Sequence, residues 1–94
     1  MNPNYKTKGY GNKAVGVTAV QLSTSNVPCE HVELINISSG IVYYGFDNSI
    51  TTANAFGALT AKDAPQIIHV GNLNELFLIS DTAAQDVRFI YYSY

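Results

Sequence analysis

Charged residues are scarce in this chain of 94 residues: they make up 13% of it, against about 25% in a typical globular protein. Hydrophobic residues reach 47%, the reverse of the balance that keeps a chain disordered, so we expect it to fold. Its length allows one domain with one thin core. With so few charges, the surface is expected to carry apolar or uncharged area that suits subunit contacts, although Ser, Thr and Asn could cover much of it.

Cysteine and long apolar runs are also scarce. The single cysteine, Cys29, excludes an internal disulfide framework, and its survival as a free thiol suits a reducing compartment such as the cytoplasm. The start MNPNYKTKGYGN has no apolar stretch of a secretory signal, and the longest apolar runs are far shorter than a membrane span. We therefore expect neither secretion by such a signal nor a membrane partner.

The few charges that are present are unevenly placed. Three lysines and no acid give residues 1–13 a charge of +3, whereas two basic residues against seven acids give residues 14–94 a charge of −5. A basic tail on an acidic body could reach an acidic neighbour, and a second copy of the body would serve. The alternative is a solvated, disordered terminus.

Clusters of Gly, Pro, Asn, Asp and Ser cut the chain into short β-rich runs, which is the pattern of an all-β protein. Six to eight short antiparallel strands with turn signals between them predict a small β-sandwich or barrel. Residues 53–63 are interpreted as a loop that can hold a single helical turn. The runs that predict strands are residues 15–23, 31–37, 41–46, 66–70, 75–80 and 87–94, with weaker candidates at 49–52 and 56–59.

The first twelve residues differ from the rest. Their proline and two glycines, with Asn, Thr and Lys between them, do not predict regular structure. We therefore expect an extended N-terminal arm over residues 1–12 and a sandwich domain over residues 13–94. Tyr5 and Tyr10 could dock into pockets on a neighbour. The alternative is a loose end with two incidental tyrosines.

One residue pair invites a chemical interpretation, Cys29-x-His31. In a strand both side chains would lie on one face and could meet one metal ion. A structural zinc site needs four ligands, however, and the only further histidine is His69. A thiol nucleophile with His69 as base has no support beyond the presence of both residues. We interpret Cys29 as a small buried side chain and His31 as a residue on the polar side of a strand, and we expect no metal, cofactor or enzymatic activity.

No other motif in the chain indicates catalysis. The segment KGYGNK lacks the G-x-x-x-x-G-K-[ST] pattern of a phosphate loop, no G-x-S-x-G elbow occurs, and the acids are scattered singly. The basic, tyrosine-bearing tail has the composition of a nucleic-acid contact, but at very short length. The acidic body argues against such binding, so we expect no nucleic-acid partner.

Tyrosine is the strongest positive signal, with seven residues and no tryptophan. In strands, the neighbours in Tyr43-Tyr44 and in Tyr91-Tyr92 must point to opposite faces, so one of each pair leaves the core. Alternation also fails in LIN, FLI and FIYY, which is typical of strands covered on both faces, and another subunit would supply the second cover. The alternative is ordinary cross-strand aromatic packing. The candidate interface residues are Tyr5, Lys6, Lys8, Tyr10, Tyr43, Tyr44, Tyr91, Tyr92 and Tyr94.

The segments AVQLSTSNVPCEHVEL, IVYYGF and, after a polar loop, VRFIYYSY follow one another in an order that resembles a known family. The chain is similar to small virion proteins of tailed bacteriophages, the cement or decoration type and related head and tail accessory modules. The resemblance covers about residues 15–94, and VPC then looks like the start of the second strand. The segment TTANAFGALTAKDAPQ departs from the family pattern, and the tail matches nothing in it.

The resemblance implies a β-sandwich or jelly-roll-like module that coats the outside of an assembled phage head and bridges its subunits. Its partners would be the major capsid protein and further copies of itself, with a trimer favoured over a dimer. Its location would be the virion, after synthesis in the host cytoplasm. An alternative is a tail or fibre accessory module that binds host carbohydrate through exposed tyrosines and loop Asn and Asp residues. A small enzyme is the least supported interpretation.

Overall fold

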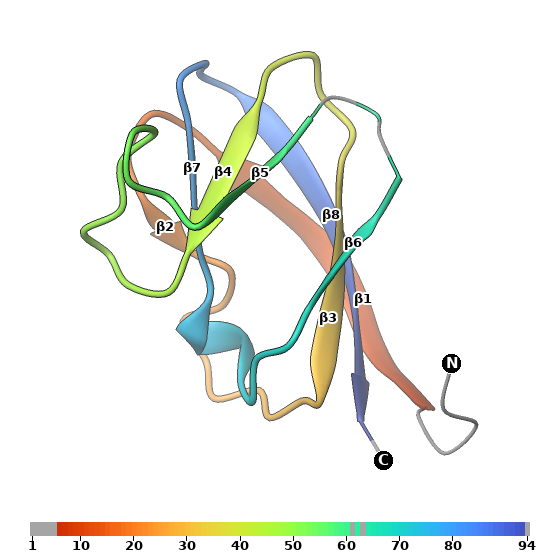
Figure 1. Cartoon of the computed structure of the whole chain (residues 1–94). Helices are drawn as coiled ribbons and strands as arrows, with labels where there is room; N and C mark the ends of the chain where they lie inside the picture. The colour runs from red at the N-terminus through yellow and green to blue at the C-terminus, as the bar shows by residue number, and fades with distance from the viewer. Residues whose placement is uncertain (1–5, 61, 63, 94) are drawn as a thin grey trace.

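The computed structural model describes residues 6–60, 62 and 64–93 (Figure 1). Within these residues, eight strands form two four-stranded sheets: sheet A has the order β1-β8-β3-β6 and sheet B has the order β2-β7-β4-β5. The elements are β1 (Lys6–Val15), β2 (Val20–Gln21), β3 (His31–Asn36), β4 (Val42–Gly45), β5 (Gly57–Leu59), β6 (Gln66–Ile68), the 3₁₀ turn η1 (Leu73–Glu75), β7 (Phe77–Ser80) and β8 (Gln85–Ser93).

The strands pair in a nested order, the first with the eighth, the second with the seventh, and so on inward. β1 pairs with β8, β2 with β7, β3 with β6 and β4 with β5, all antiparallel. Two further pairings, β3 with β8 and β4 with β7, join these pairs into the two sheets. This is the strand order of a jelly roll. The predicted small antiparallel β-sandwich is therefore confirmed. Five of the six clearest predicted strands end within two residues of observed ones, and the exception is the first, at residues 15–23.

The core lies between the sheets, because side chains alternate inward and outward along each strand. On β3, Val32 and Leu34 are fully buried, and on β8 Val87 is buried with them. Leu73 and Leu76, at the two ends of the short turn η1, are also fully buried. Each such side chain contributes roughly 1.5–3 kcal/mol by leaving water.

A buried amide links the two sheets. Asn36, the last residue of β3, donates from Nδ2 to the carbonyls of Gly40 (2.6 Å) and Leu59 (3.0 Å), and its Oδ1 accepts from the backbone N–H of Ser38 (2.9 Å). Leu59 belongs to β5, so this one side chain joins sheet A to sheet B and also forms the turn after β3. Its burial is tolerated because its polar atoms find partners.

The prediction that residues 1–12 lack regular structure is wrong for residues 6–12, which form most of β1; residues 1–5 lie outside the described residues. β1 pairs with β8 along its length, and its glycines explain how. Gly9 faces Tyr91 and Gly11 faces Phe89 in the register, and a Cβ at either glycine would meet the aromatic ring. The glycines therefore provide room for rings that lie across the strand, an arrangement known from edge strands.

Two further strand predictions are wrong. Residues 15–23 do not form one strand, because the chain bends at residues 16–19 and passes from sheet A to sheet B, leaving only the short β2. Residues 49–52 form no strand either. Asp47 there accepts from the backbone N–H of Ser49 (2.8 Å), and Asn54 accepts from that of Thr51 (2.6 Å), so local side-chain bonds favour turns over a ladder. Among the described residues, the helical turn lies at Leu73–Glu75.

Candidate interaction surface

The central strands of sheet A carry apolar side chains on both faces. On β8, Phe89 packs against the core while its neighbour Ile90 points outward, and on β3 Leu34 is buried while Ile35 points outward. Both isoleucines are half-buried. An antiparallel sheet with one face on the core commonly presents polar residues on the other, so this outer face departs from the usual pattern.

The outward residues form a row that crosses all four strands of sheet A. Tyr10 on β1 pairs with Ile90 on β8, Ile90 with Glu33 on β3, and Glu33 with Ile67 on β6. Tyr10 is 82% exposed and Ile67 is 57% exposed. Among the described strand residues, these two are the only large hydrophobic side chains that are mostly exposed. We call this set of four residues the apolar row, although Glu33 interrupts it with a charge.

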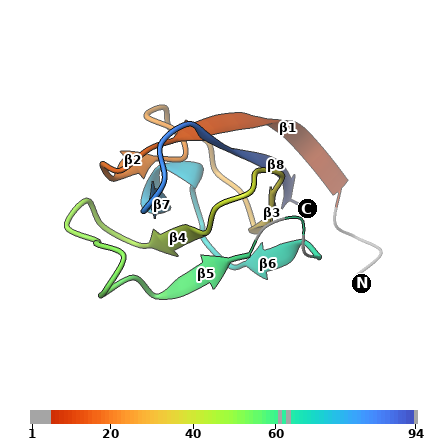
Figure 2. The same ribbon diagram turned by 90° about the horizontal axis from the view of Figure 1, so that it is seen from above.

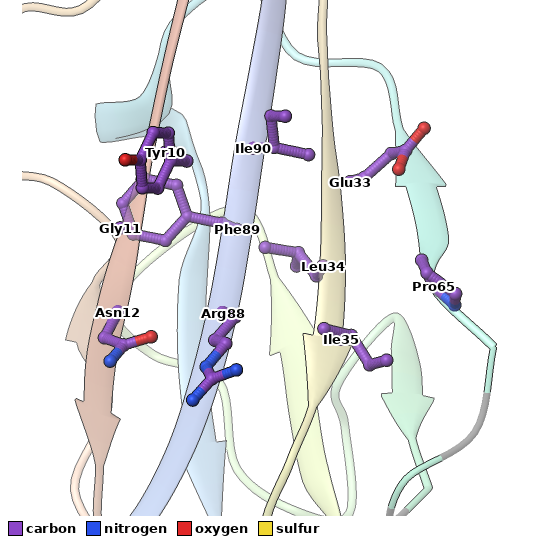
Figure 3. A pocket seen from close by; sticks show the side chains of 10 residues that line it. All are labelled: Tyr10, Gly11, Asn12, Glu33, Leu34, Ile35, Pro65, Arg88, Phe89 and Ile90. Carbon is purple, nitrogen blue, oxygen red and sulfur yellow. The ribbon is translucent and has the colours of Figure 1, made fainter.

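A groove of about 530 Å³ lies on the outer face of sheet A beside the apolar row (Figure 3). Figure 3 shows Tyr10 over β1, Arg88 and Ile90 along β8, and Glu33 with Ile35 along β3. The groove is lined by Tyr10, Gly11, Asn12, Glu33, Leu34, Ile35, Pro65, Arg88, Phe89 and Ile90.

Two opposite charges lie diagonally across the centre of this face. The register pairs Arg88 with Ile35 and Glu33 with Ile90, so Arg88 and Glu33 are diagonal neighbours on adjacent strands. Such neighbours are separated by roughly 7–8 Å. Within the described part of the chain, neither side chain has an ion pair or a side-chain hydrogen bond. The centre of the face therefore presents one unpaired cation and one unpaired carboxylate among apolar side chains, and the exposed Asp86 lies further along β8 on the same face.

Aromatic stacking covers one end of the same face. His31 on β3 is buried, and its ring stacks on Tyr92 of β8 with centroids 4.7 Å apart and planes 20° apart. His69 lies beside it, with ring centroids 5.7 Å apart. His31 thus lies on the outward side, as expected for a polar position, but Tyr92 shields it from water.

The arrangement around Cys29 does not favour a thiol nucleophile. Cys29 is partly buried against the core, and its Sγ donates to the carbonyl of Val70 at 3.2 Å. Burial raises the pKa of the Cys29 thiol, and the nearby carboxylates of Glu75 and Glu30 raise it further. Reactive cysteines have the opposite shift, because the thiolate is the nucleophile. The described residues include no group of three or more side chains placed to hold a metal ion.

The structure places the candidate interface tyrosines in different surroundings. Tyr10 is exposed on the apolar row, and Tyr92 is half-buried on the same face. Tyr91 packs inward over Gly9, and Tyr44 is a core residue at 8% exposure whose hydroxyl donates to Gln66 Oε1 at 3.3 Å. Tyr44 is therefore not available on the surface of this fold.

The remaining candidates lie on the outer face of sheet B, at the edge of sheet A or outside the described residues. Tyr43 is half-buried on the outer face of sheet B, and Lys6 and Lys8 are exposed on β1, at the edge of sheet A. Tyr5 and Tyr94 lie outside the described residues. The expected alternation within Tyr43-Tyr44 and Tyr91-Tyr92 is confirmed, because one member of each pair faces the core and the other faces outward.

Sequence reasoning did not select Ile35, Ile67 or Ile90, nor the charges Glu33 and Arg88. A partial signal was present, because LIN and FIYY break the alternation at Ile35 and Ile90. Ile67 and Ile68 break the alternation in the same way, but this run was not singled out.

A second exposed apolar feature flanks the loop between β4 and β5. The rings of Phe46 and Phe56 meet edge to face at 5.3 Å, and Phe56 is 74% exposed. In Figures 1 and 2 this loop projects on the side of the molecule away from β6 and from the N-terminal end of β1. The chain therefore presents two apolar surfaces that are well separated.

Within the part of the chain that the structure covers, no helix has the length and apolarity needed to cross a bilayer. Comparison with known proteins found no matching family model, no matching curated protein and no matching solved structure. A functional assignment for this jelly roll must therefore come from its surface, since the fold itself serves many unrelated functions.

Proposed function

We propose that the chain is a non-catalytic decoration protein, which binds the outside of an assembled bacteriophage head and stabilises it by bridging capsid subunits. The observation that supports this proposal best is the apolar row on sheet A. Its strands align exposed or half-buried Tyr10, Ile90 and Ile67 on one face, where water would otherwise meet them. Exposed apolar side chains gathered on one face in this way mark contact with other protein. Jelly rolls also occur in viral capsid proteins, which is support by analogy of fold alone.

The proposed mechanism is mass action and needs no chemistry at the surface. A protein that binds the assembled shell but not its separate subunits stabilises the shell in proportion to its affinity and concentration. Many copies on one lattice convert weak contacts into strong retention. Two separated apolar surfaces, the apolar row and the Phe46–Phe56 pair, suit a protein that touches two neighbours at once.

The basic edge of sheet A would add electrostatic attraction to the binding of the head. Lys6 and Lys8 are exposed on β1, and residues 14–94 carry a charge of −5, so the positive charge is concentrated at one edge of an acidic molecule. Such an edge is attracted to an acidic neighbour, and the attraction weakens as salt screens it.

The proposal is tested on purified phage particles. We expect the chain to co-purify with intact heads in a fixed copy ratio to the major shell protein, and to raise the temperature at which undecorated heads release DNA when it is added back. Deleting residues 1–12 would remove most of β1, so the edge is tested with the double change Lys6→Glu and Lys8→Glu. Lys62→Glu, a loop change of the same charge type, is the control.

We expect the double variant to bind heads more weakly than the control, with the largest difference at low salt. Heads that contain no copies of the chain, or heads whose stability the added chain leaves unchanged, would overturn the decoration proposal. Equal binding by both variants would remove the β1 edge from the contact.

A second candidate function, a tail or fibre module that binds host carbohydrate, is favoured by the Phe46–Phe56 pair. Exposed rings beside a loop that contains Asp47, Asn48 and Asn54 could stack on a sugar and bond its hydroxyl groups. Titration with host cell-wall polysaccharide separates the two functions. Binding that is lost in Phe56→Ala and kept in Tyr10→Ala would support the carbohydrate function.

A further inference from the structure

The outer face of sheet A carries at its centre two charged side chains that would lose contact with water if a partner covered this face. Arg88 and Glu33 lie in its centre without partners among the described residues, and Ile35 and Ile90 flank them. Any partner that covers the isoleucines must also cover these two charges. Covering a charge without a partner is strongly unfavourable, so the partner must offer an acid for Arg88 and a base for Glu33.

We infer that the partner on this face is a second copy of the chain, packed face to face about a two-fold axis. A two-fold contact brings the same surface together twice, so a residue on one copy meets a different residue on the other, and the reverse contact follows by symmetry. An axis that passes between the diagonal pair Arg88 and Glu33 sets each Arg88 opposite Glu33 of the partner subunit. One axis therefore forms two ion pairs, each between Arg88 of one copy and Glu33 of the other.

The same axis fits the apolar residues. Ile35 and Ile90 occupy the other diagonal of this four-residue set, so they lie close to the axis and meet their counterparts at the centre of the contact. Tyr10 and Ile67 lie on the two edge strands, β1 and β6, and extend the apolar area to both sides. The partner's Glu33 enters the groove beside Arg88, so the groove is complete only in the dimer.

This symmetry changes the expected number of subunits. The resemblance to decoration proteins favours a trimer because of the symmetry of shell sites, but a sheet face can be covered by only one other face. A self-complementary face therefore forms a closed dimer. The inference rests on the proposed role of sheet A as an association surface but requires no phage head, and it leaves the Phe46–Phe56 pair and the Lys6–Lys8 edge of β1 for contact with the shell.

The test uses charge reversal at the two central residues of the full-length chain. In Arg88→Glu the new carboxylate of each copy would face Glu33 of the partner subunit, and in Glu33→Arg two guanidinium groups would meet. We expect each single variant to raise the dimer dissociation constant by about tenfold or more, measured by analytical ultracentrifugation. Lys62→Glu and Asp81→Arg, loop changes of the same charge types, are the controls and are expected to leave it unchanged.

Mixing the two single variants gives the decisive measurement. A mixed dimer would set the two guanidinium groups of the Glu33→Arg copy against the two carboxylates of the Arg88→Glu copy. An equimolar mixture is therefore expected to dimerise at least as tightly as the unaltered chain. Damage to the fold cannot produce this rescue, because each variant is present in the mixture unchanged. A monomeric unaltered chain, unaffected single variants or a mixture without rescue would each overturn the inference.

These outcomes are independent of the decoration experiment. A dimer that leaves phage heads unchanged would keep this inference and remove the proposed function. A monomer that decorates heads through Arg88 and Glu33 would assign the face to the shell protein and overturn the inference.

Discussion

The outer faces of the two sheets differ in how much of their apolar surface the chain itself covers. On sheet B the outward Ile79 of β7 is only 7% exposed and pairs with the half-buried Tyr43 of β4. On sheet A the outward Ile67 is 57% exposed and Tyr10 is 82% exposed. The same kind of side chain thus contributes to the stability of the single chain on sheet B, whereas on sheet A it remains available for association.

The largest effect is expected from a matched substitution on the two faces. Ile79→Ala should lower the free energy of unfolding by about 2–4 kcal/mol, because it leaves a cavity in packed surroundings. Ile67→Ala should lower it by less than about 0.5 kcal/mol, because the side chain is exposed in the single chain. Urea titrations at a concentration too low for association measure both values. Similar losses for the two variants would remove the distinction between the faces.

The second test compares the glycines that face aromatic rings in the two sheets. A Cβ at Gly57 would lie 2.5 Å from the Tyr44 ring in sheet B, and a Cβ at Gly9 would lie 2.5 Å from the Tyr91 hydroxyl in sheet A. Tyr44 is buried and bonded to Gln66, whereas Tyr91 is only half-buried and lies over Gly9 of the edge strand β1.

We therefore expect Gly57→Ala to destabilise the chain by about 2–3 kcal/mol and Gly9→Ala by about 1 kcal/mol, both measured by thermal unfolding. Gly16→Ala is the control, because a Cβ at Gly16 meets nothing within 4 Å. A larger loss in Gly9→Ala than in Gly57→Ala would show that the edge of sheet A is packed as rigidly as sheet B.

The smallest effect is expected at Cys29, outside the strands of both sheets. Because burial and nearby carboxylates raise the pKa of its thiol, the folded chain holds this proton more tightly than the unfolded chain. The resulting stabilisation is present at neutral pH and is lost as the pH rises through the folded-state pKa. Iodoacetamide should modify Cys29 more slowly in the folded chain than in urea at about pH 8. Faster modification of the folded chain would contradict this account.

Much of the fold could be predicted from the sequence, because turn-forming residues separate short β-branched and aromatic runs. The prediction failed at β1, where Gly9 and Gly11 were interpreted as breakers of regular structure. Their role depends on Phe89 and Tyr91 at the far end of the chain, and no local pattern contains that information. The association surface was foreseen only in part, because strand register alone brings Tyr10 into one row with residues of β3 and β6.

The position of β8 within sheet A has a consequence for synthesis of the protein on the ribosome. β8 lies between β1 and β3, so β1 has no neighbour in the sheet until residues 85–93 have been synthesised. β1 can therefore pair only after β8 has been made, and this pairing joins residues as distant as Lys6 and Ser93. Such distant pairing slows folding and leaves apolar strands open while translation continues. A nascent chain of this topology therefore carries an unpaired β1 until β8 has been synthesised, which raises its risk of aggregation.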